Sequence, residues 1–191
     1  MSRYLAFYKP FEVLSQFTDR QGRRTLKDYI HVSGVYAAGR LDYRSEGLLL
    51  LTDDGALIHR LTSPRYEHPK TYLAQVEGLV SEPAIHRLNE EIVLPGLQTK
   101  TARARIIPDP HLPPRTTPVR DYHPTTWLEI VLQEGKKHQV RRMTAAVGYP
   151  TLRLVRIAIG SLRLGQLNPG EWRHLTPNEL RNLKRETRRR G

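Results

Sequence analysis

The 191-residue sequence predicts a single domain of the mixed α/β class, of the α+β type, in which strands and helices follow one another along the chain. Two patterns support this prediction. Several short segments show the apolar alternation or the continuous apolar run of a strand. The segments between them place apolar residues on one helical face and begin with capping residues. The chain contains no cysteine, which excludes disulfide bonds and thiolate metal sites.

The predicted strands are bounded by Gly, Pro and Asp, which are typical of turns. They cover residues 4–8, 13–17, 35–38, 48–51, 70–78, 102–107 and 127–133. The segment 48–51 consists of four leucines, which are too few for a membrane span and favour a strand that is covered on both faces. In the segment 70–78, strict alternation directs Tyr72, Ala74 and Val76 to one side of the sheet.

The predicted helices follow residues that can accept hydrogen bonds from the first helical turn. They begin after Thr25, Asp54, Ser81 and Thr176, and a further helix runs on from the basic segment 136–143 to residue 147, with Gly148 as its stop. Thr176 and Glu179 have the spacing of a capping box, with Pro177 at the first helical position. We expect the chain to fray beyond Leu183.

The formal net charge of +12 comes from the second half of the chain alone. Residues 1–99 hold 12 Lys and Arg against 12 Asp and Glu, whereas residues 100–191 hold 19 against 7. This asymmetry indicates a polyanionic partner, most simply a nucleic acid. No apolar stretch approaches the roughly 20 residues of a membrane span, and the N-terminus lacks a signal-peptide core. We therefore expect a cytoplasmic protein that does not contact a membrane.

Asp42 is the candidate nucleophile. It lies in a polar loop between the apolar segment 35–38 and the leucine strand, so a rigid, buried support would hold its carboxylate in place. On composition alone, a different interpretation is more common, because loop Asp side chains often accept hydrogen bonds from nearby backbone N–H groups.

Three blocks, in the same order as in the family, resemble the RsuA-type pseudouridine synthases. The first block is GRLD, residues 39–42, followed by SEGLLLLT, residues 45–52. The second is the K-x-Y block, residues 70–72, and the third is EGKKHQVRRM, residues 134–143. The segment TLRLVRIAIG, residues 151–160, extends the resemblance towards the C-terminus.

The resemblance implies one catalytic domain, residues 1–183, built on a long, bent and mostly antiparallel sheet flanked by helices. A basic C-terminal tail, residues 184–191, would follow, and no S4 domain would precede the catalytic domain. The implied activity is that of an isomerase that converts a specific uridine of large-subunit (23S) ribosomal RNA, in the peptidyl-transferase region, to pseudouridine. No cofactor is needed, because atoms are only rearranged. We expect a monomer.

The resemblance also implies the site residues. Asp42 would attack the nucleotide, Arg141 would pair with Asp42 and keep it ionised, and Tyr72 would stack on the base and assist proton transfer. Arg40 would fill the space that the target base leaves, and Leu154 would pack against Tyr72. The residues implied to contact substrate or RNA are Arg40, Leu154, Lys70, Lys136, Lys137 and Arg142.

Three alternatives stay open on the sequence. A non-catalytic RNA-binding or ribosome-assembly protein on the same fold would have the same charge. A nucleoside glycosidase would need a second acid near Asp42, for which Glu46 is the only close candidate. The proline-rich segment 108–124 could clamp RNA or be a mobile loop. The eight histidines lack metal-ligand spacing, so we predict no metal site.

Overall fold

In the computed structural model, residues 2–120 and 123–188 are described, and within them nine strands form one sheet. The strand order is β11-β1-β3-β9-β4-β8-β7, with β2 added beside β3 and β10 beside β9. The strands are β1 (Tyr4–Lys9), β2 (Tyr36–Ala37), β3 (Glu46–Thr52), β4 (Lys70–Glu77), β7 (Arg103–Ile107), β8 (Thr125–Leu132), β9 (Thr151–Ile159), β10 (Leu162–Arg163) and β11 (Trp172–His174). A separate hairpin consists of β5 (Val93–Leu94) and β6 (Leu97–Gln98).

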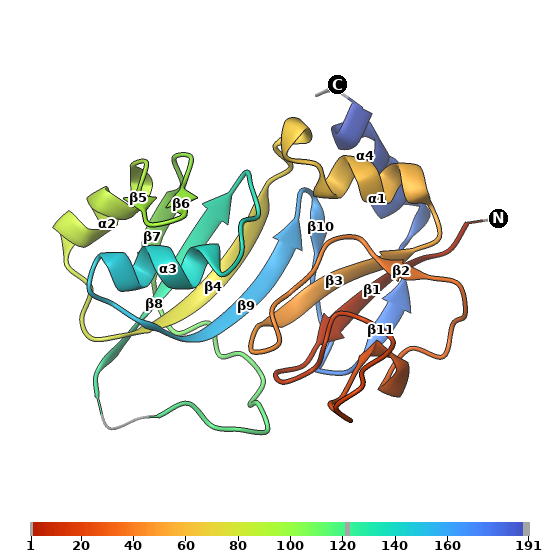
Figure 1. Cartoon of the computed structure of the whole chain (residues 1–191), viewed down its shortest axis with the longest axis horizontal. Coiled ribbons are helices and arrows are strands. Elements are labelled where there is room, and N and C mark those ends of the chain that lie inside the picture. Colours follow the sequence, from red (N-terminus) through yellow and green to blue (C-terminus); the bar gives the residue numbers. More distant parts are fainter. Residues whose placement is uncertain (1, 121–122, 189–191) are drawn as a thin grey trace.

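All pairings in this sheet are antiparallel except the contact between β3 and β9, which is parallel and short. The contact divides the sheet into two halves, β11-β1-β3 and β9-β4-β8-β7 (Figure 1). The mixed α/β class and the mostly antiparallel sheet that the sequence predicts are therefore confirmed.

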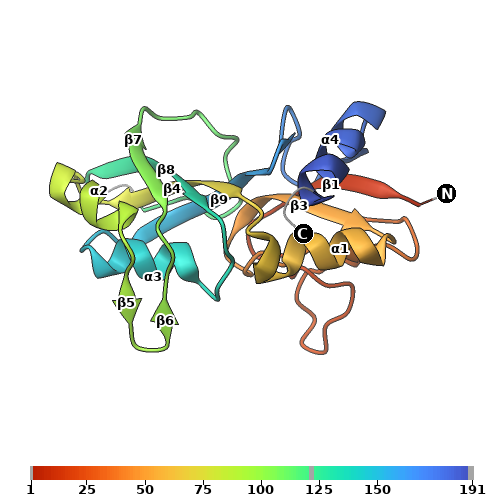
Figure 2. The same cartoon turned by 90° about the horizontal axis from the view of Figure 1, so that it is seen from above.

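The helices are α1 (Gly55–Thr62), α2 (Glu82–Asn89), α3 (Gln139–Ala146) and α4 (Pro177–Arg188). Seen from above, α1 and α3 lie on the same side of the sheet, and the segment that leads into β8 crosses the opposite side (Figure 2). The amphipathic faces of α2 and α3 cover one cluster of buried side chains, which includes Leu88, Leu128 and Met143. Those of α1 and α4 cover a second cluster, which includes Leu57 and Leu183.

The predicted caps are found at three helix starts. Asp54 accepts a hydrogen bond from the Leu57 N–H at 3.0 Å, and Thr176 and Glu179 form the reciprocal capping box. Thr25 caps only a short 3-10 turn, Leu26–Asp28. The predicted strand 13–17 is wrong, because Leu14 makes only an isolated bridge with Thr25.

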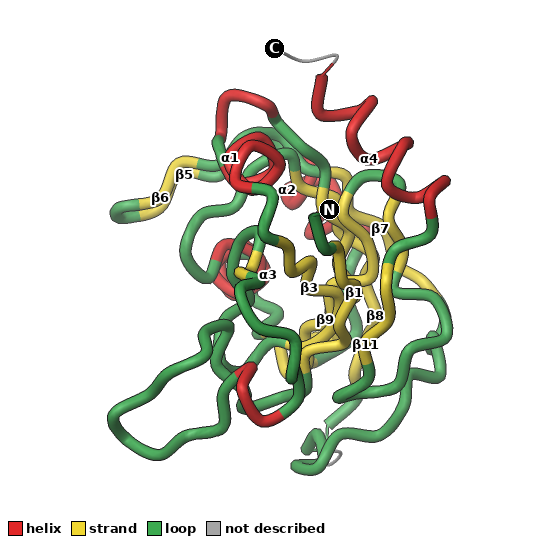
Figure 3. The backbone as a smooth tube through the Cα atoms, turned by 90° about the vertical axis from the view of Figure 1, so that its right-hand side faces the viewer, coloured by secondary structure: helices red, strands yellow, loops and turns green. Residues whose placement is uncertain are grey.

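The C-terminal helix is longer than expected. It continues to Arg188, so the domain boundary predicted at residue 183 falls inside α4 and the expected fraying does not begin there. Figure 3 shows α4 as one continuous helix that leads to the C-terminus. Lys184 donates a hydrogen bond to the Tyr4 hydroxyl, and Thr187 is buried. Residues 189–191 of the predicted tail lie outside the described residues.

Gly47 permits the parallel contact between β3 and β9. Its φ of +103° lies in a region that L-residues with side chains rarely adopt, and a Cβ at this position would lie 2.3 Å from the Arg156 carbonyl oxygen. Any larger residue would push the two halves of the sheet apart.

We predict that Gly47→Ala lowers the free energy of unfolding by about 3–5 kcal/mol, because backbone strain and overpacking add at this position. Gly96→Ala is the matched control. Gly96 also has a positive φ, +65°, but nothing lies within 4 Å of the added Cβ, so the loss should be about 1 kcal/mol. Urea unfolding of both variants measures the difference, and equal losses would contradict this account of Gly47.

Candidate active site

A cavity of about 720 Å³ lies where the two halves of the sheet meet. Its walls come from the loop before β3, the end of α1, the start of β4, the segment between β8 and α3, and the middle of β9. Seven of the nine predicted site residues line it: Arg40, Asp42, Lys70, Tyr72, Lys136, Lys137 and Leu154. The structure thus brings together residues that are more than 100 positions apart in the sequence.

The loop that carries Asp42 is fixed from several sides. The buried Ser15 hydroxyl donates to the Leu41 carbonyl oxygen at 2.8 Å and accepts from the Leu41 N–H at 3.0 Å. The Ser45 N–H donates to the Asp42 carbonyl oxygen at 2.9 Å. The Lys9 ammonium donates to the carbonyl oxygens of Val13 and Tyr43, at 2.7 and 3.4 Å. The Asp42 carboxylate is therefore presented by a backbone with few ways to move.

His138 faces Asp42, and the sequence reasoning gave this residue no role. Its Nε2 lies 3.5 Å from Asp42 Oδ1, which makes an ion pair when the imidazole is protonated. His138 precedes α3 in a left-handed conformation, with φ of +54°. A non-glycine residue in this conformation is strained, and such strain is frequent at functional sites. The third block contains His138, but residue type alone does not signal a left-handed conformation.

Arg141 does not form the ion pair with Asp42 that the family resemblance implies. Within residues 2–120 and 123–188, its guanidinium donates instead to the carbonyl oxygens of Thr151, at 3.0 Å, and Arg44, at 2.8 Å. Burial lowers its pKa, and the nearby charge of Asp42 opposes that shift. Arg141 therefore reaches the backbone of the Asp42 loop two residues beyond the carboxylate, and its charge still acts on Asp42.

Arg142 does not line the cavity either. It donates a hydrogen bond to the Pro95 carbonyl oxygen and so tethers the β5–β6 hairpin to α3. This hairpin projects on the side of the sheet that carries α1 and α3 (Figure 2). The two consecutive arginines thus hold two different segments, as expected from their angular separation of about 100° on a helix.

Tyr72 and Leu154 lie on the same side of the sheet in the same cluster of buried side chains. Tyr72 is 9% exposed, and Leu154 stands opposite Ala74, two residues further along β4. Strand alternation puts side chains two residues apart on the same face, which explains why both reach the cavity. They supply an aromatic and an aliphatic surface of the kind on which a planar ring can rest.

Two lysines near Asp42 have lowered pKa values: Lys9, which is fully buried, and Lys70, which is half-buried and lines the cavity. Burial lowers the pKa of Lys9 to about 7, although the charges of Glu46 and Asp42 oppose this shift. Burial, and then the charge of Arg156, lower the pKa of Lys70 to about 8. Lys70 donates to the His68 carbonyl oxygen at 3.0 Å. Both side chains therefore lose their proton more easily than an exposed lysine, and both lie near the loop or the cavity that carries Asp42.

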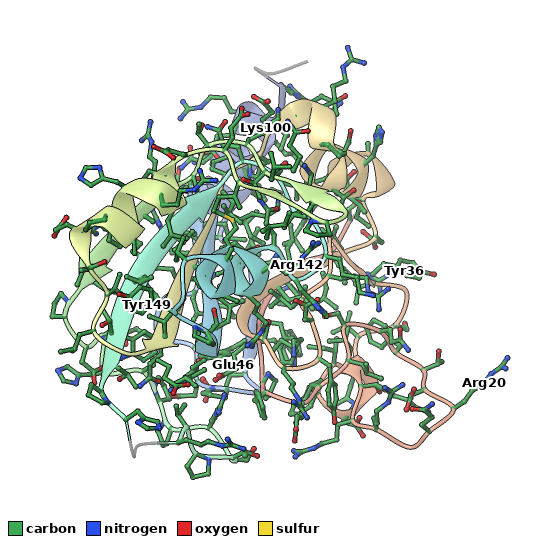
Figure 4. The ribbon with its side chains drawn as sticks, turned by 60° about the vertical axis from the view of Figure 1, so that its left-hand side comes forward. Arg20, Tyr36, Glu46, Lys100, Arg142 and Tyr149 are labelled. Atoms are coloured by element: carbon green, nitrogen blue, oxygen red, sulfur yellow. The ribbon has the colours of Figure 1, made fainter. Side chains whose placement is uncertain are left out.

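Glu46 (labelled in Figure 4) is almost completely buried and does not line the cavity. Its carboxylate accepts two hydrogen bonds from Arg153, at 3.0 and 2.8 Å, and both side chains are buried. The second acid of the cavity wall is Glu134, which binds Gln139 Nε2 and the Lys100 N–H. Neither carboxylate is thus arranged as the second acid of a glycosidase.

Within residues 2–120 and 123–188, no group of three or more His, Asp or Glu side chains is arranged to hold a metal ion. No helix in the same residues combines the length and the apolar character needed to cross a membrane.

Comparison with known proteins gives matches over most of the chain. The family model described as RNA pseudouridylate synthase matches residues 3–146. The protein named ribosomal large subunit pseudouridine synthase E of Vibrio vulnificus is 50% identical over 176 residues, which cover 91% of this chain and 75% of that protein. The protein of the same name from Xanthomonas axonopodis pv. citri is 54% identical over 166 residues, covering 84% and 87%.

A solved structure described as the crystal structure of pseudouridylate synthase has a TM-score of 0.82 and 32% sequence identity. The match covers 96% of this chain and 74% of that one, so it extends over both halves of the sheet.

The burial of Lys9 leads to a prediction about how the stability of the protein depends on pH. Its pKa is about 7 in the folded protein and near its ordinary 10.5 in the unfolded chain, so the unfolded chain binds more protons between these values. Raising the pH through this window therefore increases stability. In Lys9→Met this titration is absent, so the free energy of unfolding of the wild type relative to this variant should rise by about 2–3 kcal/mol from pH 7 to pH 9.

Urea unfolding at both pH values measures this difference. The control is Lys27→Met, at an exposed lysine, for which the difference from the wild type should be flat across the same range. If the difference for Lys9→Met does not change with pH either, burial does not lower the pKa of Lys9.

Proposed function

Because this chain belongs to the RNA pseudouridylate synthase family, we propose that it converts a uridine of large-subunit ribosomal RNA to pseudouridine with Asp42 as its nucleophile. The chain is an isomerase of this family, and the predicted family resemblance is confirmed. The observation that carries the proposed roles is that Asp42, Tyr72 and Leu154 line one cavity although they come from three distant segments.

The reaction breaks the N1–C1′ bond of the uridine and joins C5 of the ring to C1′, with loss of the C5 proton and gain of a proton at N1. A carboxylate is a recognised nucleophile in covalent catalysis, and it must be ionised to attack. His138 Nε2, at 3.5 Å, lies within ion-pair distance of the Asp42 carboxylate, and Lys9 and Arg141 lie near enough for their charges to interact with it. The hydrogen bonds of Ser15 and Lys9 to the loop hold the carboxylate where the sugar and base must enter.

The base must leave its helical stack to reach this cavity, at an unstacking cost of a few kcal/mol. Tyr72 would stack on the extruded uracil and take part in the proton transfer at C5, with Leu154 closing the site on the same side. Arg40 lines the mouth of the cavity next to Asp42 and is placed to occupy the space that the base leaves.

The RNA backbone would follow the positive rim of the cavity. Lys136 and Lys137 are exposed on the segment before α3. Lys70 lies inside the cavity, and Arg142 holds the hairpin that borders this side. Ammonium groups neutralise phosphates without reading sequence, so these residues would supply affinity rather than site selection. The relatives named for the large ribosomal subunit support a target in 23S RNA, which we propose to lie in the peptidyl-transferase region, and a cytoplasmic location.

We predict that Asp42→Asn abolishes pseudouridine formation, with a rate loss on the order of 10⁴-fold or more, because the amide cannot attack. Wild type and variant are incubated with large-subunit ribosomal RNA transcript, and pseudouridine is mapped by carbodiimide-dependent reverse-transcription stops. Asp109→Asn, at an exposed acid outside the cavity, is the control and should retain full activity. A stop of equal strength with Asp42→Asn, or no stop with the wild type, would overturn the assignment.

Arg141 gives a second, separate prediction. Arg141→Lys keeps the positive charge but cannot bridge the carbonyl oxygens of Arg44 and Thr151, so the Asp42 loop loses its tie to α3. We expect the single-turnover rate to fall about 10²-fold while the protein stays folded. Arg163→Lys, at an exposed arginine on β10 outside the cavity, is the control and should change the rate little. Equal rates for both variants would mean that charge alone, and not the two hydrogen bonds, is what Arg141 supplies.

A further inference from the structure

Arg156, on β9, is a buried cation that the roles described so far do not use. Its side chain lines the cavity, yet the residue is only 2% exposed. Its Nε donates to the Leu48 carbonyl oxygen at 2.8 Å. Among the described residues its Nη2 has no hydrogen-bond partner, although the atom is buried. A charged donor without a hydrogen-bond acceptor in the interior costs free energy, so a bound group that offers an acceptor to Nη2 would remove this cost.

An irregularity in the sheet sets the position of Arg156. Thr71 of β4 is paired with Ala158 of β9, but the next residue of β4, Tyr72, is paired with Arg156. Ile157 of β9 is therefore the extra residue of a bulge. A regular register would put Ile157 opposite Tyr72. Directly paired residues project to the same side, so the bulge brings the guanidinium to the side that carries the Tyr72 ring and Leu154. Bulges are frequent next to active sites, where they redirect a side chain.

A purely structural role explains the hydrogen bond of Arg156 Nε but not Nη2, which lacks a partner in residues 2–120 and 123–188. The Nε bond to Leu48 extends the short parallel contact between β3 and β9, and it would be kept in a protein that has no substrate. This hydrogen bond does not involve Nη2, which a structural role leaves without a partner within the same residues. Glu46, a buried acid on the paired strand β3, is already bound by two nitrogens of Arg153.

The electrostatic surroundings also point to an electron-rich ligand. Besides burial, which is the larger cause, the charge of Arg156 lowers the pKa of Lys70 and of Lys9, so both lysines lie within electrostatic range of this guanidinium. Exposed lysines at the rim, such as Lys137, suit hydrated phosphates. A guanidinium that is 2% exposed and lies beside Tyr72 suits instead the group that enters deepest, which is the extruded base.

Building on the proposed function, we propose that Arg156 binds the target uracil ring, with the unoccupied edge of its guanidinium donating a hydrogen bond to a ring carbonyl oxygen. This gives the site a residue that recognises the base itself, in addition to the surface on which the base stacks. Uracil carries carbonyl oxygens at C2 and C4, both acceptors, whereas cytosine presents an amino donor at C4. A guanidinium aimed at O4 would therefore accept uracil and reject cytosine.

The same contact would assist the reaction. If the carboxylate attacks C6, the electron pair of the C5–C6 double bond moves towards O4. If it attacks C1′, the pair of the N1–C1′ bond stays on the detached ring, where it is shared with O2 and O4. On either route, negative charge develops on a ring oxygen before C5 joins C1′ and the C5 proton leaves. A fixed cation beside that oxygen stabilises this state more than the neutral ground state.

Sulfur substitution of the ring oxygens tests the contact. Large-subunit RNA is assembled by ligation with uridine, 2-thiouridine or 4-thiouridine at the mapped position, and single-turnover product formation is followed by chromatographic separation of the isomers. The full-length wild type is compared with Arg156→Gln, and Arg163→Gln, at an exposed arginine on β10, is the matched control. Thermal unfolding of each variant is measured in parallel.

With the oxygen substrate, we expect Arg156→Gln to be about 10²–10³-fold slower than the wild type. In the wild type and the control, sulfur at the contacted position should slow the reaction about tenfold, because sulfur is a weak acceptor. In Arg156→Gln that sulfur effect should disappear. If the oxygen-to-sulfur rate ratios at both positions are the same in variant and wild type, the proposal is wrong, and Arg156 only supports the sheet.

Two further results separate the remaining possibilities. If Arg156→Gln does not fold, Arg156→Lys replaces it, and an unchanged ratio in that variant also overturns the contact. If the variant instead loses the sensitivity of the wild type to a methylphosphonate at the target phosphate, Arg156 binds phosphate and the base contact is excluded. Absence of product with the wild type on the oxygen substrate would refute the proposed function itself, which is a different outcome.

Discussion

The short parallel contact between β3 and β9 is the constraint on which the rest of this structure depends. It consists of Glu46 opposite Val155 and Gly47 opposite Arg156, and it is the place where the two halves of the sheet join. The loop with Asp42 leads into one side of this contact, and Leu154 and Arg156 lie on the other. Three features secure it: the buried Glu46–Arg153 pair, the Arg156–Leu48 hydrogen bond and the absence of a side chain at Gly47. A shift here would separate the nucleophile from the surface on which the base rests.

Several buried charged side chains lie at the contact between β3 and β9. Removing one partner of a buried ion pair costs about 3–5 kcal/mol, because the remaining charge loses its compensation. Glu46 and Arg153 satisfy one another, but the buried guanidinium of Arg156 forms no ion pair among the described residues, so positive charge is in excess beside the cavity. Such an excess lowers the stability of a free protein. It is the arrangement expected of a site whose substrate brings negative charge during the reaction.

Much of the fold could be predicted from local sequence. Four leucines indicated a buried strand, and Asp54 and Thr176 marked helix starts, because these features depend on neighbours in the chain. The cluster of Asp42, Tyr72 and Leu154 followed from resemblance to a family, since strand patterns do not specify which strands pair. The left-handed conformation of His138 could not be predicted, nor could the bulge that brings Arg156 opposite Tyr72, because both are imposed by tertiary packing. The resemblance correctly directed Arg141 to the loop that carries Asp42, but its guanidinium binds the Arg44 carbonyl oxygen there and not the Asp42 carboxylate.

The proline-rich segment 108–124 makes contacts with the sheet that its composition does not predict. Its described part lies on the side of the sheet opposite α1 and α3 (Figure 2), away from the side on which the cavity residues gather. There, Arg115 stacks over the Phe11 ring at 4.2 Å, and Arg153 donates to the Pro113 carbonyl oxygen at 2.8 Å. Arg153 thus binds this segment and Glu46 at the same time. The segment therefore reinforces the junction of the sheet from the side opposite the cavity.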